Sequence, residues 1–511
     1  EQMSTPTPIR DPWNEPQPLF RPRSVAVIGA SEKPGPGLQV IENLHQLGYA
    51  GKILPINPKY AQIAGHPCYP SLTAAKEAGE SVDMVAILLG RERIIPVLEE
   101  AARVGARAAW AFAAGFGELD DTGKELERKL IEVCRDNHIH FVGPNCVGYL
   151  NPSVGAGTYS APAPAVIRRG HIGMGAQSGY LSIAVANSQR DLGFSLLVST
   201  GNESLIDCTD VMSYMLEDPE THVIMAFVEQ FRSPEKLKAV ARRSREVGKP
   251  IIFIKVGRSE MAQRATSAHT GALAGSDRVQ DALFKKLGLI RVDDLDEMFE
   301  TAILLSSLTH RLPKGNGVFA VTLSGGVISL MADVGEDISL RFPAWSDAGR
   351  EKVKSLLSSY SNVNNPLDAW GSGRIEEFYE TCLLTAAAED TADIVVVVQD
   401  VPGGMAERQV QQYSIVARAA VEAAKKIDKP IVMVNNASTG FHPEIKRILN
   451  EGGVPLLQGT RESLKAIANL VAFGTYRPDS AVPADTARFP ALPAHTAKGL
   501  TEYQSKQVLR Q

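Results

Sequence analysis

His269 is the residue of this sequence with the clearest capacity for chemistry. It stands in the run 267–275, where small residues and glycines surround it on both sides, so a reacting group can reach its ring. Imidazole is neutral and nucleophilic near physiological pH, and it accepts a phosphoryl group at one nitrogen. A phosphohistidine intermediate needs a histidine that is accessible in this way. The alternative is a loop histidine that makes one hydrogen bond and does no chemistry.

Glu229 is the acid that we expect beside this loop. It follows the apolar run 223–228, and the histidine loop follows the apolar run 251–254. Ligands of doubly wound sheets collect at the carboxyl ends of the strands, so Glu229 and the loop should emerge on one edge. A carboxylate there bonds an imidazole nitrogen and favours the cation that arises during phosphate transfer. The alternative is an ordinary surface glutamate.

Two similar turns are candidate anion sites. Ser178 and Gly179 follow the apolar run 172–176, and Ser324, Gly325 and Gly326 follow the run 318–323. A serine at the start of a helix places a hydroxyl and unpaired N–H groups where an anion can bind, and the helix dipole favours negative charge. The simpler interpretation of each serine is a helix N-cap.

A third candidate anion site is the glycine-rich turn 29–37, which follows the apolar run 25–28 and opens a helix. Its backbone N–H groups could hold a phosphate. The order G-x-G-x-x-G is absent, and the second strand ends in Asn57, Pro58 and Lys59 rather than in an acid. Both observations argue against NAD.

The elements that position these residues alternate between short apolar runs and helical patterns, which is typical of α/β proteins with parallel sheets. We expect three consecutive doubly wound sheets, with linkers at 161–164 and 168–170. The expected strands are 25–28, 53–56, 84–88, 108–112 and 139–142, then 172–176, 194–199, 223–228 and 251–254, then 318–323, 393–399 and 431–435.

Composition excludes several partners. The 53 basic and 58 acidic residues give a net charge of −5, which provides no general attraction for nucleic acid or an anionic membrane. The five cysteines are scattered, without the spacing of a disulfide framework or a zinc site, so no metal site is predicted. No stretch approaches the roughly 20 apolar residues of a membrane span, and the cytoplasm fits best.

Several motifs together resemble the NDP-forming acyl-CoA synthetases, the family of ADP-forming acetate–CoA ligase and succinyl-CoA synthetase. They are S-A-H-T-G-A-L-A-G at 267–275, V-I-G-A-S at 27–31, P-I-N-P-K at 55–59, G-F-G-E at 115–118, G-P-N-C-V-G at 143–148 and N-N-P-L-D at 364–368.

The resemblance implies a role for each candidate residue. His269 would be the phosphohistidine and Glu229 its partner, while Ser178, Gly179, Ser324, Gly325 and Gly326 would bind the phosphate. The residues implied to line the CoA site are Gly29, Ser31, Gly35, Asn57, Pro58, Lys59 and Asn145.

The resemblance also implies a domain order. It comprises an N-terminal arm (1–19), a Rossmann-like CoA-binding domain (20–150), a ligase domain with the phosphohistidine loop (151–310), a second, flavodoxin-like ligase domain (315–475), a linker (476–499) and the start of a truncated ATP-grasp domain (500–511). ATP and Mg²⁺ would bind through the missing part of that ATP-grasp domain, so the sequence is expected to be a fragment. A homo-oligomer, such as a dimer, is also expected.

The implied function is ligation of a carboxylic acid to CoA, with release of ADP and phosphate, through acyl-phosphate and phosphohistidine intermediates. Two alternatives remain open: a non-catalytic module that senses CoA, and the CoA-binding part of a protein acyltransferase. The acid cannot be read from the sequence, so acetate, branched acids, aryl acids and sulfonium-bearing acids are all candidates.

Overall fold

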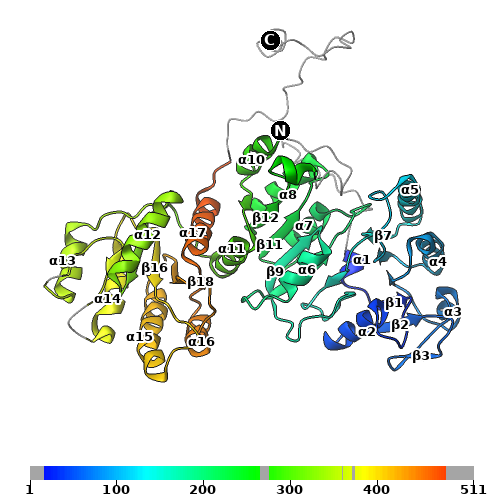
Figure 1. Ribbon diagram of the computed structural model, residues 1–511, viewed down its shortest axis with the longest axis horizontal. Helices are drawn as coiled ribbons and strands as arrows, with labels where there is room; N and C mark the ends of the chain where they lie inside the picture. Colours follow the sequence, from blue (N-terminus) through cyan, green and yellow to red (C-terminus); the bar gives the residue numbers. More distant parts are fainter. Residues whose placement is uncertain (1–16, 265–275, 360, 371–373, 479–511) are drawn as a thin grey trace, which may run out of the picture. The chain divides into compact units, whose positions relative to one another are not determined.

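The computed structural model of the chain describes residues 17–264, 276–359, 361–370 and 374–478. The architecture below is that of the described residues up to Tyr476, which belong to one compact unit. Its strands form three sheets of five or six strands and one short hairpin (Figure 1). The prediction of three consecutive doubly wound sheets is confirmed. The predicted ATP-grasp start at 500–511 lies outside the described residues.

The first sheet has the strand order β2-β1-β5-β6-β7, and all of its pairs are parallel. Its central strands are buried along their whole length, which explains why they read as continuous apolar runs. The strands are β1 Ser24–Ile28, β2 Lys52–Ile56, β5 Met84–Ile87, β6 Ala108–Ala111 and β7 His140–Val142. The other elements of this part are α1 Gln17–Phe20, α2 Pro36–Gln46, β3 Gln62–Ile63, β4 His66–Pro67, α3 Leu72–Glu77, η2 Arg91–Arg93, α4 Ile94–Val104 and α5 Asp121–Asp136.

The second sheet has the order β13-β12-β11-β9-β10-β8. Its strands are parallel except β8, which pairs antiparallel with β10 at the edge. The strands are β8 Tyr149–Leu150, β9 Arg169–Ala176, β10 Phe194–Ser199, β11 Val223–Val228, β12 Ile251–Lys255 and β13 Ile290–Val292. The helices are α6 Gly179–Ala186, α7 Cys208–Glu217, α8 Pro234–Val247, α10 Asp277–Lys286 and α11 Leu295–Leu308.

One predicted linker is wrong. Arg169 and Gly170 belong to β9, where the linker 168–170 was expected. A side chain on Gly170 would meet the Cα atom of Gly193 at 2.6 Å, so the strand approaches the turn before β10 closely at this point. The first residues of β9 are partly exposed, and an exposed strand end with glycine and arginine looks like a linker in sequence.

The third sheet has the order β15-β14-β16-β17-β18, and all of its pairs are parallel. Its strands are β14 Val318–Thr322, β15 Leu367–Asp368, β16 Ile394–Val398, β17 Ile431–Asn435 and β18 Leu456–Gln458. Its helices are α12 Gly325–Asp337, α13 Asp347–Leu356, α14 Ile375–Ala388, α15 Glu407–Ala424, α16 Pro443–Glu451 and α17 Thr460–Thr475.

The apolar core is continuous between neighbouring sheets. One buried cluster contains residues of the first and second sheets, including Val27 and Val198, and another contains residues of the second and third, including Ile252 and Val396. Helices α11 and α17 pack against each other between the second and third sheets (Figure 1). In the part of the chain that the structure describes, no helix is long and apolar enough to cross a membrane.

Candidate active site

Gln177 joins the ends of two neighbouring strands at the carboxyl edge of the second sheet. Its backbone N–H donates to Phe227 O at 3.1 Å, which continues the β9–β11 ladder. Its side-chain Oε1 accepts from the backbone N–H groups of Glu229 at 2.6 Å and Gln230 at 3.1 Å. The two strand ends are therefore tied together, and the backbone of Glu229 is fixed beside the turn that begins at Ser178.

The chain that leads into the histidine loop lies on the same edge. β12 pairs with β11, and Lys255 at its end is opposite Val228, the residue before Glu229. Glu229 and the residues that follow β12 therefore lie on one edge, and the position of the histidine loop itself stays a prediction. His269 itself lies outside the described residues, so its contact with Glu229 stays a prediction.

Lys255 is a candidate that the sequence did not suggest. Its side chain is largely buried, and Nζ donates to Val256 O at 2.6 Å. Burial lowers the pKa of Lys255, with a further decrease from Arg291, while Asp277 and Glu229 act in the opposite direction. The amine therefore lies in the electrostatic field of the strand-end glutamate. The available signal was a lysine that closes an otherwise apolar strand.

The turn at Ser178 is a capped helix start. Ser178 Oγ accepts from Leu181 N–H at 3.3 Å, so the serine is the N-cap of α6. A side chain at Gly179 would approach the Val147 Cγ1 methyl group to 3.1 Å, which leaves little room for any other residue. The N-cap interpretation is confirmed, and binding of a phosphate by Ser178 and Gly179 stays a prediction.

The turn at Ser324 is more open. Ser324 starts α12 without a side-chain capping bond, and Ser324, Gly325 and Gly326 are all exposed. A side chain at Gly325 would lie 3.4 Å from Asp368 Oδ2, so a carboxylate lies close to this helix start. The meeting of the two helix N-termini at one histidine stays a prediction.

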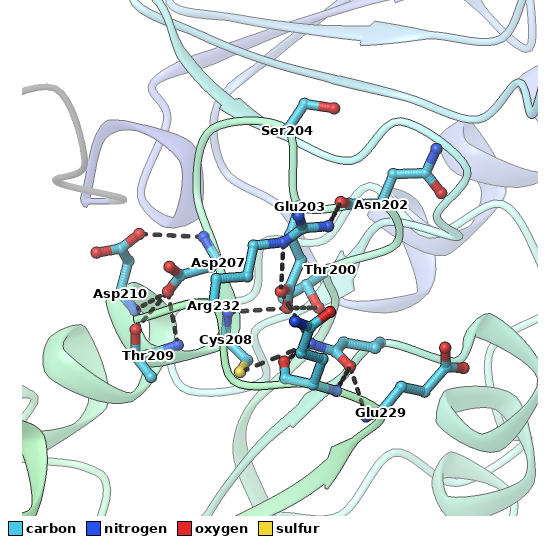
Figure 2. A network of polar contacts seen from close by, with 12 residues as sticks. Thr200, Asn202, Glu203, Ser204, Asp207, Cys208, Thr209, Asp210, Glu229 and Arg232 are labelled. Carbon is cyan, nitrogen blue, oxygen red and sulfur yellow. Dashed lines mark hydrogen bonds and ion pairs between the residues drawn. The ribbon is translucent and has the colours of Figure 1, made fainter. Parts of the chain in front are cut away.

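A buried acid, Glu203, contacts Gln177 from the loop between β10 and α7 (Figure 2). Glu203 is 3% exposed, and it accepts from Gln177 Nε2 at 2.8 Å, Thr200 Oγ1 at 2.8 Å and Cys208 N–H at 2.9 Å. Figure 2 shows Arg232 over this carboxylate, and the Nε–Oε2 distance is 3.6 Å. The side chain of Glu229 extends away from this network in the same view.

The protonation of Glu203 is shifted by this environment. Burial, with a smaller contribution from the charge of Asp207, raises the pKa of Glu203 to about 7. The hydrogen bonds from Thr200 and Gln177 and the charge of Arg232 limit the rise. The sequence analysis assigned no role to Glu203, because the burial of a single loop carboxylate has no sequence periodicity.

The Glu203 loop also contacts the residues that follow β6 and β7 of the first sheet. Asn202 Nδ2 donates to Glu118 Oε2 at 2.5 Å, and Asn145 Nδ2 donates to Asn202 Oδ1 at 3.2 Å. Glu118 in turn accepts from the N–H groups of Gly115 at 2.7 Å and Phe116 at 3.0 Å. Hydrogen bonds therefore join the Glu203 loop to two of the motifs noted in the sequence, G-F-G-E at 115–118 and G-P-N-C-V-G at 143–148.

Most of the predicted CoA residues gather at the ends of β1 and β2. Gly29 has a φ of 86°, and a side chain there would meet Leu88 O at 2.8 Å, so glycine is required. Asn57 Nδ2 donates to Ala30 O at 2.7 Å, and Asn57 Oδ1 accepts from Lys59 N–H at 3.0 Å. Asn57 thus links the turn after β1 to the turn after β2.

The remaining members of the predicted CoA set differ in position. Ser31 Oγ bonds only within its own turn, to Lys33, among the contacts of the described residues, and Pro58 and Lys59 are exposed. Gly35 has an open neighbourhood, whereas a side chain at Gly37 would meet Ala30 Cα at 2.8 Å. Gly37 is therefore the glycine that lets α2 pack closely against the turn after β1. The sequence analysis did not assign this role to Gly37.

Asn145 does not join the group at β1 and β2. It follows β7, which is separated from β1 by β5 and β6 in the sheet. With strands about 4.8 Å apart, this places it roughly 14 Å from the turn after β1. A ligand that contacted both would have to extend along the sheet edge.

Comparison with known proteins identifies these two parts of the chain. Residues 23–152 match a CoA-binding domain, and residues 169–305 match the succinyl-CoA ligase-like flavodoxin domain. The chain is 31% identical over 461 residues to the alpha subunit of acetate–CoA ligase [ADP-forming] II of Pyrococcus furiosus, covering 89% of this chain and 96% of the subunit. The chain belongs to the ADP-forming acyl-CoA ligase family.

Two further comparisons agree with this family. Trans-feruloyl-CoA synthase FCS1, from an unknown prokaryotic organism, is 30% identical over 96% of this chain and 69% of its own length. The structure of a dinucleotide-forming acetyl-coenzyme A synthetase 1 from Ca. Korarchaeum cryptofilum, in complex with phosphate and ADP, superposes with a TM-score of 0.77 and 26% identity over 90% of this chain and 97% of that one.

The family assignment settles the enzyme class as an acid–thiol ligase that uses CoA and a nucleotide. Both domain matches cover candidate residues: Gly29 and Asn57 in the first, Ser178 and Glu229 in the second. Among the described residues, no group of three or more His, Cys, Asp or Glu side chains is arranged to hold a metal ion.

Proposed function

We propose that this chain of an ADP-forming acyl-CoA ligase carries out the acyl half of the reaction through a phosphohistidine at His269. In the direction of acyl-CoA synthesis, the phosphorylated imidazole gives its phosphoryl group to the carboxylate of the acid. The thiol of CoA then attacks the carbonyl carbon of the acyl phosphate, the C–O bond to phosphate breaks, and inorganic phosphate leaves. The reverse direction returns phosphate to the histidine.

The junction at Gln177 is the observation that carries this proposal. It fixes the backbone of Glu229 beside the start of α6, on the edge from which the histidine loop begins. A carboxylate there holds an imidazole in one tautomer and stabilises its cationic form. A helix N-terminus beside it stabilises the phosphoryl charge over its first turn.

The other components of the reaction are assigned as follows. CoA binds at the turn after β1 and the turn after β2, where Gly29 lets the chain turn close to Leu88 and Lys59 supplies a cation. ATP binds through an ATP-grasp domain, and Mg²⁺ supplies charge neutralisation for its phosphates there. The protein acts in the cytoplasm as a homo-oligomer. The acid is not decided by the relatives, whose names specify acetate in one case and trans-ferulate in another.

Phosphate labelling tests the proposal without the nucleotide step. The chain is incubated with radiolabelled inorganic phosphate and a panel of acyl-CoA thioesters, and protein-bound phosphate is measured. We expect an acid-labile, base-stable label on the peptide that contains His269, and no label in His269→Ala. A matched control is His310→Ala, a histidine that follows α11. Stable binding of CoA without any labelling by any thioester would support the CoA-sensing alternative instead.

A further inference from the structure

A cavity opens at the carboxyl edge of the third sheet, beside the start of α12. Its volume is about 380 Å³, and it is lined at one end by Ser324 and by the ends of β14 and β16. A second cavity of about 280 Å³ adjoins it, and the two share Leu323, Trp370, Ile375 and Gln412. Small-molecule sites commonly have volumes of about 300–1,000 Å³ and lie at this edge of such sheets.

Trp370 forms the wall that the two cavities share. Its backbone is held on both sides, because its N–H donates to Asp368 Oδ1 at 3.1 Å and its carbonyl accepts from Ser361 Oγ at 3.3 Å. Its side chain is nevertheless 58% exposed. An uncovered indole on a backbone that is held in place offers a face on which an apolar ligand can pack. Leu323 and Ile375 are the partly buried apolar residues beside it.

The charges around the cavity argue against a second carboxylate on the ligand. Asp400 is the charged residue among the described residues that line the larger cavity, and it already accepts from Asn436 N–H at 2.6 Å and Asn436 Nδ2 at 3.0 Å. The smaller cavity contains Arg374, which pairs with Glu376 at 3.9 Å and Glu377 at 3.7 Å. A dicarboxylic acid would therefore place its second charge against Asp400, or against a cation that is already paired.

We propose that this cavity binds the aromatic body of an aryl monocarboxylic acid, with the ring against Trp370 and the carboxyl group toward the start of α12. The proposal rests on the proposed function, since it assigns the acid of that same reaction. An acid as small as acetate would leave most of the cavity and the Trp370 face unfilled. A planar ring fills the space between Trp370, Leu323 and Ile375 and stacks on the indole.

Competition between acyl-CoA thioesters tests this assignment. Initial rates of phosphate labelling are measured with cinnamoyl-CoA, acetyl-CoA and succinyl-CoA for the unaltered chain, Trp370→Ala, Trp370→Phe and the control Leu330→Ala. Leu330 lies on α12 and is 43% exposed, so it matches the exposure of Trp370 without lining either cavity. Cinnamoyl-CoA should label fastest. Trp370→Ala should lower the cinnamoyl-to-acetyl ratio of rates roughly tenfold, Trp370→Phe should restore most of it, and Leu330→Ala should leave it unchanged.

Other outcomes separate this inference from the proposed function. Labelling that is fastest with acetyl-CoA or succinyl-CoA, or a ratio that Trp370→Ala does not change, would overturn the aryl-acid assignment while the phosphohistidine reaction stands. If no thioester labels the chain, the proposed function fails, and the cavity is then tested by saturation-transfer NMR with cinnamate. A transfer signal that Trp370→Ala removes supports an aryl site, and its absence from the unaltered chain refutes one.

Discussion

The second and third sheets present the same Ser-Gly turn in two different states. In the second sheet Ser178 is half-buried, caps α6 through Leu181, and follows the glutamine that ties two strands together. In the third sheet Ser324 is exposed, lacks a side-chain capping bond, and borders a cavity with an indole in its wall. The same Ser-Gly motif, at the same position after a strand, is thus half-buried and capped in one sheet and exposed beside a cavity in the other.

The difference suggests a division of labour between the two turns. The Ser178 turn is held in place by its own hydrogen bonds before any ligand binds. Such a preorganised turn suits the binding of the phosphoryl group, which is the same in every turnover. A turn that opens onto an apolar cavity suits the side that must accept and release a varied acid. The predictions below test whether the surroundings, rather than the shared motif, determine what each turn does.

Glu229→Gln should give the largest effect, because it removes the charge that we assign to the histidine while keeping the side chain's size. The bond between Glu229 N–H and Gln177 uses the backbone, so the strand junction is preserved. We expect phosphate labelling to fall about 100-fold, in the range of lost acid–base partners. Labelling kinetics measure this loss, and CoA affinity by calorimetry should change less than twofold.

Glu235→Gln is the matched control for this variant. Glu235 is an exposed glutamate in the first turn of α8, a few residues after Glu229. Its labelling rate should equal that of the unaltered chain. A Glu229→Gln variant that labels at the unaltered rate would show that the strand-end acid is an ordinary surface glutamate, and it would leave the Gln177 junction with a purely structural role.

The sheets were predictable from sequence because their strands are buried on both faces. β11 and β16, for example, appear as uninterrupted apolar runs bounded by polar turns. β8 and β15 were not predicted as strands, since each has two residues and gains its identity only by pairing with a strand distant in sequence. Strands of that length carry no periodicity to read.

The sequence predicted the site residues whose positions are set by the end of a strand. It predicted less well the residues whose roles depend on how helices pack on the sheet. Glu229 and the start of the histidine loop share an edge because adjacent parallel strands end there. The choice between Gly35 and Gly37 depends on where α2 crosses the turn after β1, which only the folded chain shows. The cavity at Trp370 was not expected either, because its walls come from β14, β16 and the helices α12, α14 and α15, which are far apart in sequence.

A pair of serine variants tests the difference between the two turns directly. Ser178→Ala removes the N-cap of α6, whereas Ser324→Ala removes a side chain that makes no capping bond. Loss of an N-cap costs about 1 kcal/mol, or roughly a fivefold change in local opening. Hydrogen exchange followed by mass spectrometry should show that increase in the first turn of α6 for Ser178→Ala. The first turn of α12 should be unchanged in Ser324→Ala, and equal increases would contradict the contrast.

The last prediction concerns Glu203, the buried acid that contacts Gln177. The pKa of Glu203 is raised to about 7 in the folded chain, from the ordinary glutamate value of 4.5. Between these two values the folded state retains a proton that the unfolded state has lost, so the stability contributed by this group falls as the pH rises through that window. Above pH 7 the penalty is constant, and from the size of the shift it reaches at most about 3 kcal/mol.

Glu203→Gln removes this titration because the amide keeps one charge state. The melting temperature of the variant, measured relative to the unaltered chain, should therefore rise as the pH is increased from 5 to 8. Glu99→Gln, at an exposed position of α4, provides the control and should show no such trend. If the difference in melting temperature between Glu203→Gln and the unaltered chain did not change with pH, the Arg232 charge and the hydrogen bonds from Thr200 and Gln177 would fully offset the effect of burial on the pKa of Glu203. Glu203, which contacts the residue before Ser178, would then be ionised at neutral pH. The second sheet would have the Glu203–Arg232 ion pair beside its Ser-Gly turn, whereas the third sheet has an apolar cavity beside its turn.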